Sequence, residues 1–312
     1  MNELFAPEVR YSVVGAARSG VAAANFLARA GRDVWLSDSK PADKLGKELQ
    51  GLDPRVRTAF GANEVRPGDV VVLSPGVSPL SPVFAACAKA GRCVVSEVEL
   101  FAAWHRGPMA AITGTDGKST TTKLVGDLLA AGGLDPFVGG NIGNALTEAL
   151  PDLAPERWVV AEVSNAQLIT TAGAFRPRVA TVLNIAEDHT SYHGSFEAYQ
   201  EAKRLVWRNM GASDVLVLNA DDPYIPRWTL DARCPVQWFS PAGRPGHDAH
   251  FADGAVWHRH EKLIDWSEFP IPGRHNVENV LAAALLARAA GVGVDTIRDT
   301  LRAFRGLAHR ME

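Results

Sequence analysis

Residues 112–122 read ITGTDGKSTTT, and this stretch predicts the fold of the chain around it. The residues before Gly114 have the composition of a strand, a glycine-containing turn follows, and a helix begins after Gly117. That order directs backbone N–H groups and the positive end of a helix toward an anion. Lys118 can reach the outer phosphates of a nucleoside triphosphate, and the Ser119 hydroxyl can bind Mg²⁺. The predicted phosphate-binding residues are Gly114, Thr115, Asp116, Gly117, Lys118, Ser119 and Thr120.

This turn is shorter than the common phosphate loop, which has a glycine five residues before its Gly-Lys pair. Ile112 occupies that position here and still belongs to the predicted strand. A chance Gly-Lys-Ser in an ordinary loop is the alternative interpretation. The strand before the turn and the helix after it favour a phosphate site.

Strands and helices alternate on the C-terminal side of this turn, as is typical of a parallel sheet covered by helices. We predict strands at 158–163, 179–185 and 215–219, and helices at 119–131, 195–210 and 277–290. Between 241 and 272 the pattern changes to short alternating segments around Gly254. This change predicts a small antiparallel β addition.

The N-terminal third of the chain predicts a second parallel sheet. An Ala-rich segment at 21–30 and a predicted helix at 82–90 each lie between two short apolar runs, which is the pattern of a β-α-β unit. The apolar runs are at 11–15, 34–36, 70–73 and 93–95.

Residues 104–108, WHRGP, have the composition of a linker between the two parts. We therefore predict an α/β chain of two domains. Residues 1–105 form a Rossmann-like parallel-sheet domain, and residues 106–305 form a P-loop-type central ATPase domain that carries the antiparallel addition.

The composition supports two globular domains, because 46% of the 312 residues are hydrophobic and 21% are charged. A formal net charge of -3 offers no general attraction for nucleic acid. Cys87, Cys93 and Cys234 show neither a disulfide nor a metal-binding spacing, which indicates a reducing compartment. Because no secretory signal or long apolar stretch is evident, we expect a cytoplasmic protein without a membrane partner.

Polar residues follow two predicted strands of the central domain. Glu162 ends one strand, and Asp188 and His189 follow the next. Carboxyl ends of parallel strands meet at one edge of a sheet, so Glu162 and His189 are candidate Mg²⁺ ligands. A helix-capping role is the alternative for Glu162, and a structural role for His189. The composition around Lys203 predicts an exposed lysine.

Taken in order, these segments resemble the Mur ligase family, which also includes the folylpolyglutamate synthetases. The resemblance covers essentially the whole chain. Its motifs are GTDGKST at 114–120, GGNIG at 139–143, EVSNAQL at 162–168, NIAEDH at 184–189, EAYQEAK at 197–203, NADD at 219–222, GRHNVEN at 273–279 and GLAHRME at 306–312. The Rossmann-like first domain and SPGV at 74–77 most resemble the member that joins D-glutamate to UDP-N-acetylmuramoyl-L-alanine.

The resemblance implies an ATP-dependent amide ligase of peptidoglycan precursor synthesis. In that reaction the substrate carboxylate attacks the γ-phosphate of ATP, and the D-glutamate amine displaces phosphate from the acyl phosphate, with Mg²⁺ neutralising the oxygens. The expected catalytic residues are Lys118, His189 and Lys203. The expected metal ligands are Ser119, Glu162, His189 and Lys203, the last carbamylated so that it carries a carboxylate-like anion.

The resemblance also implies binding residues for both nucleotides. Asn141 and Ser164 are expected near the substrate and phosphates. The nucleotide base and its surroundings are expected to contact Asn276, Asn279, His309 and Arg310. The turn at 15–20, GAARSG, is expected to hold UDP, although Ala17 replaces a glycine of the dinucleotide fingerprint. The expected UDP-binding residues are Arg18, Ser19, Asp38, Ser39, Lys40, Ser74, Pro75 and Gly76.

The chain departs from the family at a few positions that bear on substrate contacts. Asp116 stands where asparagine is common, Asn165-Ala166 replaces Ser-Phe, and residues 190–192 replace Leu-Asp-Arg. Family members have a third domain after the HR-x-E motif. We therefore expect 306–312 to begin a hinge to a domain that this chain lacks, and the chain alone to be an incomplete catalyst and a monomer.

Three other functions remain as alternatives. The first is a different Mur-type or folylpolyglutamate ligase. The second is a non-catalytic UDP-sugar binding or regulatory module. The third, a nicotinamide oxidoreductase, rests on GAARSG alone and leaves residues 109–312 unexplained.

Overall fold

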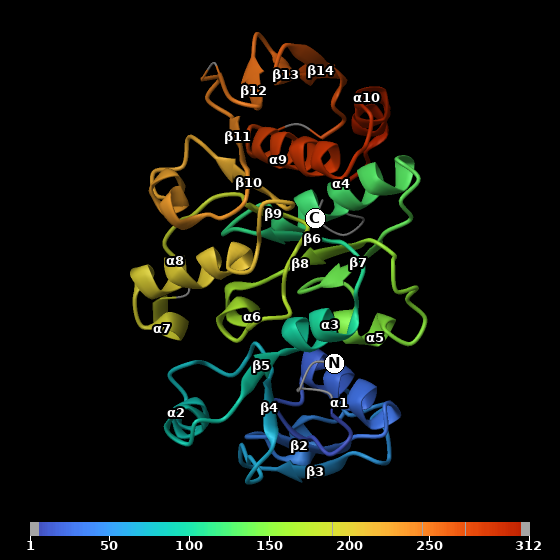
Figure 1. Ribbon diagram of the computed structural model, residues 1–312, viewed down its shortest axis with the longest axis vertical. Helices are drawn as coiled ribbons and strands as arrows, with labels where there is room; N and C mark the ends of the chain where they lie inside the picture. The colour runs from blue at the N-terminus through green and yellow to red at the C-terminus, as the bar shows by residue number, and fades with distance from the viewer. Residues whose placement is uncertain (1–5, 189, 245, 272, 307–312) are drawn as a thin grey trace.

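Two sheets follow one another along the long axis of the molecule (Figure 1). The computed structural model describes residues 6–188, 190–244, 246–271 and 273–306. The N-terminal sheet is wholly parallel, in the order β3-β2-β1-β4-β5. Its strands are β1 (Arg10–Val14), β2 (Asp33–Asp38), β3 (Arg57–Phe60), β4 (Val70–Leu73) and β5 (Val94–Ser96). This sheet confirms the predicted α/β fold of the N-terminal part.

Helices α1 (Arg18–Arg29) and α2 (Pro82–Lys89) connect strands of this sheet, and a short 3-10 turn, η2 (Ala42–Lys44), follows β2. The α2 helix begins where expected because Ser81 accepts a hydrogen bond from the Phe84 amide and proline occupies the first helical position. A further helix, α3 (Glu97–Trp104), was not predicted and begins directly after β5. The predicted linker therefore connects a helix to the next strand.

The second sheet has the strand order β14-β13-β12-β11-β10-β9-β6-β8-β7. Following this spatial order from the β7 edge, neighbouring strands are parallel as far as β12. The last two pairs, β12 with β13 and β13 with β14, are antiparallel, which confirms the predicted antiparallel addition. Its strands are β6 (Met109–Thr113), β7 (Phe137–Gly140), β8 (Val159–Glu162), β9 (Val179–Val182), β10 (Val215–Asn219), β11 (Val236–Ser240), β12 (Ala249–Ala252), β13 (Ala255–His258) and β14 (Glu261–Asp265).

Helices cover both faces of the second sheet (Figure 1). On one side α4 and α9 pack closely together, with α10 beside them. The other side carries the shorter helices next to the N-terminal sheet. The helices are α4 (Lys118–Ala131), α5 (Leu146–Ala149), α6 (Asn165–Ile169), α7 (Thr190–His193), α8 (Phe196–Arg204), α9 (His275–Ala289) and α10 (Val294–Ala303), with 3-10 turns η3 (Leu205–Trp207), η4 (Ile225–Asp231) and η5 (Trp266–Glu268).

Strand β6 shows how the sequence decides the two faces. Ala110 and Ile112 pack into the apolar cluster under α4 and α9, whereas Met109 and Ala111 pack into the opposite cluster, because successive side chains of a strand alternate. The cluster that contains Met109 and Ala111 also includes residues of the N-terminal sheet and Phe101 of α3. Apolar packing therefore joins the two sheets.

Several element boundaries differ from the prediction. The helix predicted over 195–210 ends at Arg204 and continues as the 3-10 turn η3, and the strand predicted over 179–185 ends at Val182. Helix α10 was not predicted. None of the helices in the described part of the chain has both the length and the apolar character that a membrane span requires.

Candidate functional site

The turn between β6 and α4 is shaped as an anion site. Gly117 caps α4 with φ +80, and because it is glycine it has no side chain that could cap the amides of this 14-residue helix. A Cβ at Gly117 would lie 2.1 Å from Oδ1 of Asn279, so glycine is needed for space as well as for backbone conformation. The open N-terminus of α4 can therefore receive phosphate oxygens.

Lys118 lies over this turn. Its Nζ donates to the carbonyl oxygens of Gly114, at 3.0 Å, and Thr115, at 2.6 Å. Ser119 and Thr120 follow on the first turn of α4 and are partly exposed. The cation and the helix amides thus come from one short segment, as the sequence predicted for a phosphate-binding turn.

Glu162 ends β8, which is hydrogen-bonded to β6, and its side chain is 1% exposed. One carboxylate oxygen accepts a hydrogen bond from Nδ2 of Asn141 at 2.9 Å. The other, Oε2, is buried and has no hydrogen-bond partner in the described part of the chain. A buried carboxylate oxygen is stable only with a partner, so this arrangement suits a cation. Glu162 caps no helix in this arrangement.

Lys203 is buried rather than exposed, which contradicts the expectation from composition; its exposure is 1%. Its Nζ donates to the Thr113 hydroxyl at 3.2 Å and to the Gly114 carbonyl at 2.7 Å. Burial lowers the pKa of this amine well below its ordinary value, and the nearby Lys118 cation lowers it further. Glu162 acts in the opposite direction.

A cavity of about 420 Å³ opens beside the turn and lies between α4 and α9 residues. Asp116, Gly117, Asn276 and Asn279 are among its lining residues. The two asparagines are buried and bonded to each other, from Nδ2 of Asn279 to Oδ1 of Asn276 at 3.0 Å. Asn279 also accepts from the Thr121 hydroxyl of α4 at 3.1 Å. The predicted adenine-side residues therefore shape the wall of a cavity of ligand size.

The N-terminal turn at 15–20 is tightly built. Asp38 accepts from the Ala16 amide at 2.7 Å, and the Ser74 hydroxyl donates to the Gly15 carbonyl at 2.7 Å. A Cβ at Gly20 would lie 1.8 Å from that same carbonyl oxygen. Helix α1 begins here without a side-chain cap, so its N-terminus can also receive an anion.

Comparison with known proteins matches both parts of the chain. Residues 112–287 match the Mur ligase middle domain, and residues 9–96 match the Mur ligase MurD-like N-terminal domain. The UDP-N-acetylmuramoylalanine--D-glutamate ligase of Acidobacterium capsulatum is 40% identical, over 96% of this chain and 67% of that protein. The enzyme of the same name from Geobacillus kaustophilus is 37% identical, over 97% and 68%.

The chain belongs to the Mur ligase family. This confirms the predicted enzyme class, an ATP-dependent amide ligase of peptidoglycan synthesis. Solved structures agree with the fold. UDP-N-acetylmuramate:L-alanyl-gamma-D-glutamyl-meso-diaminopimelate ligase from Neisseria meningitides superposes with a TM-score of 0.65 at 21% identity, covering 96% of this chain and 99% of that one. UDP-N-acetylmuramate-alanine ligase from Thermotoga maritima gives 0.57 at 21% identity, covering 96% and 69%.

The remaining residues predicted from the Mur ligase resemblance differ in their burial and in their hydrogen bonds. His189, His309 and Arg310 lie outside the described residues. Ser164 completes a capping box at the start of α6, in which its hydroxyl accepts from the Gln167 amide at 3.3 Å. Its hydroxyl therefore already has a structural role. Around the UDP-side turn the structure leaves Ser39, Lys40 and Gly76 exposed, Pro75 partly exposed, and Ser19 buried.

Arg18 does not extend freely from the UDP-side turn. Its guanidinium donates to the carbonyls of Gly143, at 2.6 Å, and Asn141, at 2.9 Å, in the central part of the chain. Tyr192, one of the residues where this Mur ligase departs from its family, lies at another contact between the two parts. The Tyr192 hydroxyl donates to the Val77 carbonyl at 2.9 Å, and the Ser78 hydroxyl donates to the Tyr192 carbonyl at 2.9 Å.

Sequence reasoning missed three groups that build the site. Asn184 accepts from the Asp116 amide at 2.9 Å, which orients the turn, while the Asp116 side chain stays exposed. The Tyr199 hydroxyl lies 2.9 Å from the Thr115 hydroxyl. Glu97 accepts from the Thr147 amide at 2.6 Å. Two acidic residues in the otherwise apolar stretch 97–103 were the available signal for Glu97.

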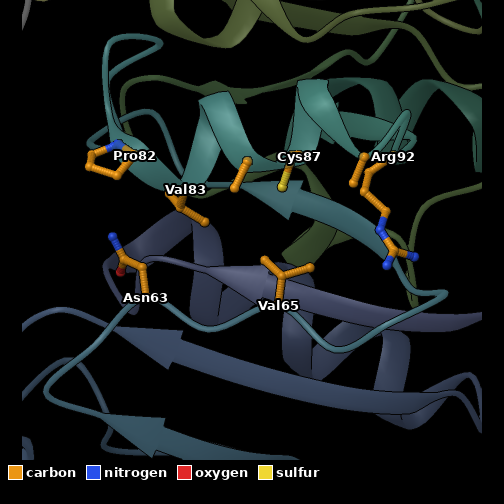
Figure 2. Close-up of a pocket in the computed structure, with 8 residues that line it drawn as sticks. Asn63, Val65, Pro82, Val83, Cys87 and Arg92 are labelled. Carbon is orange, nitrogen blue, oxygen red and sulfur yellow. The ribbon is translucent and has the colours of Figure 1, made fainter.

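A second cavity, of about 580 Å³, lies between α2 and the chain that follows β3 (Figure 2). Val83 and Cys87 of α2 face Val65 and Asn63 across it (Figure 2). None of the predicted site residues within the described ranges lines this cavity. It is therefore separate from the candidate site.

Proposed function

We propose that this Mur ligase uses ATP to join D-glutamate to UDP-N-acetylmuramoyl-L-alanine in the cytoplasm. Relatives with that activity in their names are 37% and 40% identical over nearly the whole chain. The observation that carries the proposal is the arrangement of Lys118, Lys203 and Glu162 around one anion-binding turn. Two amines and a buried carboxylate at a helix N-terminus suit a triphosphate with its metal ion.

We assign the two substrates to the two parts of the chain. Residues 1–105 hold the UDP group, with its diphosphate at the uncapped start of α1. Residues 106–305 hold ATP, with its phosphates at α4 and its base in the cavity beside Asn276 and Asn279. Continuous apolar packing between the sheets supports a fixed distance between the two substrates.

Lys118 supplies the positive charge for the outer phosphates. In the structure its Nζ donates to two neutral carbonyl oxygens, at 2.6 and 3.0 Å. Charged phosphate oxygens are stronger acceptors than carbonyls, so a bound triphosphate draws the amine toward itself. The α4 amides add fixed dipoles that favour the charge of phosphoryl transfer without reorganisation.

The residues present fit Mg²⁺. Within the described ranges no three His, Cys, Asp or Glu side chains gather into a complete metal site. Glu162, however, has one buried oxygen without a hydrogen-bond partner, and Ser119 offers a hydroxyl at the phosphate turn. Oxygen donors of this kind suit Mg²⁺, which takes its other ligands from phosphates and water. When bound, the metal would neutralise phosphate charge and polarise the phosphorus.

We propose that Lys203 is carbamylated. Burial lowers the pKa of this amine and so favours its neutral, nucleophilic form, whose nitrogen lone pair can form a bond to the carbon of CO₂ while one proton leaves for water. The product is an N-carboxylate. This exchange would replace a buried amine beside Lys118 with an anion, which attracts both the Lys118 ammonium and a divalent cation.

Calorimetric titration tests the proposal directly. We expect saturable binding of the non-hydrolysable ATP analogue AMP-PNP only with Mg²⁺, and weaker binding to a Ser119→Ala variant. UDP-N-acetylmuramoyl-L-alanine should bind more tightly than UDP-N-acetylmuramate, which lacks the alanine. Binding of the UDP compounds without any binding of Mg²⁺-AMP-PNP would instead favour the non-catalytic UDP-sugar module. Preference for a folate or for a longer UDP-peptide would favour another ligase of the family.

A further inference from the structure

The structure contains a polar tie between the UDP-side turn and the ATP-side edge of the central sheet. Arg18, the first residue of α1, reaches the loop that follows β7 and donates to two of its carbonyls. The NH1–Gly143 oxygen distance is 2.6 Å and the NH2–Asn141 oxygen distance is 2.9 Å, while a third contact to the Gly140 oxygen is 3.4 Å. A planar guanidinium that bonds several carbonyls at once restrains the loop conformation.

The loop that Arg18 holds is the one that positions the Asn141 amide. Asn141 is bonded twice to Glu162, from its backbone amide to the Glu162 carbonyl at 2.9 Å and from Nδ2 to Oε1 at 2.9 Å. Gly140 has φ +109, and a Cβ there would lie 2.4 Å from the Glu162 carbonyl oxygen. The loop therefore packs directly against the strand end that carries Glu162.

A second side chain from the N-terminal part holds the other end of this segment. Glu97 of α3 is 1% exposed and accepts a hydrogen bond from the Thr147 amide of α5 at 2.6 Å. Both ties thus run from side chains of the first part to backbone atoms of residues 141–147. Backbone contacts of this kind fix loop geometry whatever side chains the loop presents.

We propose that Arg18 is a positioning residue that couples occupancy of the UDP-side turn to nucleotide binding at Lys118 and Glu162. The inference rests on the proposed function, because it takes the UDP diphosphate to lie at the start of α1. A guanidinium has five N–H donors, so an anion at the start of α1 can accept from Arg18 while the carbonyls of the 140–143 loop still do, and the bound anion then restrains the guanidinium on that loop. The loop in turn keeps Asn141 on Oε1 of Glu162, so that Oε2 remains available to a cation.

The first test measures each ligand in the presence and absence of the other. In the unchanged chain, saturating UDP-N-acetylmuramoyl-L-alanine should tighten Mg²⁺-AMP-PNP binding by about fivefold or more, with the same factor in the reverse titration. In Arg18→Gln that factor should fall to about one. Arg18→Lys should be intermediate, because it keeps the charge but not the fork of donors. Arg29→Gln, an exposed arginine in the last turn of the same helix, should behave as the unchanged chain.

The second test removes the UDP compound altogether. Arg18→Gln should weaken Mg²⁺-AMP-PNP binding several-fold even then, and should speed amide hydrogen exchange over residues 139–147 while the far-UV circular dichroism spectrum stays unchanged. Weaker UDP-compound binding with unaltered Mg²⁺-AMP-PNP binding would make Arg18 a plain phosphate ligand and overturn the inference. Independent binding of the two ligands in the unchanged chain would also overturn it, yet leave the proposed function intact. Failure of both ligands to bind would instead defeat the proposed function.

Discussion

Lys118 and Lys203 donate to the same acceptor, the carbonyl oxygen of Gly114, with Nζ–oxygen distances of 3.0 and 2.7 Å. The first amine belongs to α4 and the second to α8, so distant segments bring two ammonium groups to one oxygen. Two cations this close repel each other, most strongly where water is excluded. Lys203 is the more buried of the two, and its burial together with the Lys118 charge lowers the pKa of its amine.

The first prediction concerns the modification of Lys203. Chain equilibrated with ¹³C-bicarbonate should show one carbamate resonance in ¹³C NMR, because a neutral buried amine captures CO₂ whereas a protonated surface lysine does not. Lys203→Ala should lose the resonance, and Lys123→Ala, which changes a partly exposed lysine of α4, should keep it. Retention of the signal in Lys203→Ala would contradict the assignment.

The second prediction separates metal binding from folding at Glu162. Glu162→Gln keeps an acceptor for Asn141 but replaces the carboxylate charge, so Mg²⁺-AMP-PNP should bind at least about tenfold more weakly. Because Oε2 is buried without a hydrogen-bond partner in the described part of the chain, removing the charge should leave the free energy of unfolding unchanged or higher. Both quantities can be measured, by calorimetry and by urea denaturation.

Glu99→Gln is the matched control, because Glu99 is also buried but uses its two oxygens to accept from the Ala174 and Phe175 amides, at 2.7 and 2.9 Å. That variant should lower stability by about 1–3 kcal/mol and leave Mg²⁺-AMP-PNP binding unchanged. If Glu99→Gln weakened Mg²⁺-AMP-PNP binding and Glu162→Gln lowered stability instead, the roles assigned to the two carboxylates would be reversed.

The third prediction tests the shape of the phosphate turn. Gly117→Ala should destabilise the chain by more than Gly133→Ala, although the two glycines have nearly equal φ values of +80 and +79. Both substitutions carry a backbone strain of about 1 kcal/mol or more. Only at Gly117 does the new Cβ meet another atom, Oδ1 of Asn279 at 2.1 Å, whereas nothing lies within 4 Å at Gly133. Urea denaturation gives the comparison, and equal losses would mean that the Asn279 contact is unimportant.

The fourth prediction is a pH dependence that originates at Glu97. Burial raises the pKa of this carboxyl from 4.5 to about 7, despite the hydrogen bond from Thr147. The folded state therefore binds more protons than the unfolded state between those two values, and stability falls as pH rises across that window. The full loss is up to about 3 kcal/mol. Glu97→Gln should flatten this part of the stability profile, and Glu48→Gln, at an exposed position, should not.

Equilibrium denaturation at a series of pH values checks this prediction. We expect the free energy of unfolding of the unchanged chain to fall between pH 5 and 7. A free energy of unfolding that rises over this range by a similar amount would contradict the prediction. The result bears on the further inference too, because Glu97 and Arg18 hold the same segment of chain. Ionisation of Glu97 adds a buried charge at the Thr147 tie without removing its acceptor.

Lys203 shows where sequence reasoning was incomplete and what could have improved it. Its local sequence, EAYQEAK, is polar, and composition alone predicted exposure. Tyr199, Ala202 and Lys203 are nevertheless the buried residues of α8 and follow the i, i+3, i+4 spacing of one helical face. The structure places the Lys203 amine against the Gly114 carbonyl of the phosphate turn, and the chemical role that the family resemblance implies for it stays a prediction.

The strand, turn and helix at 112–122 could be predicted because each depends on neighbouring residues: β-branched side chains in the strand, glycines that permit positive φ in the turn, and the Gly-Lys-Ser sequence that opens the helix. The alternating sheets and the antiparallel addition follow from similarly local periodicity. The tie from Arg18 to the Gly143 carbonyl, the burial of Lys203 and the meeting of two lysines at Gly114 are different. The residues that these features bring together are 85 to 125 positions apart in the sequence, so the features depend on how the two sheets and their helices pack.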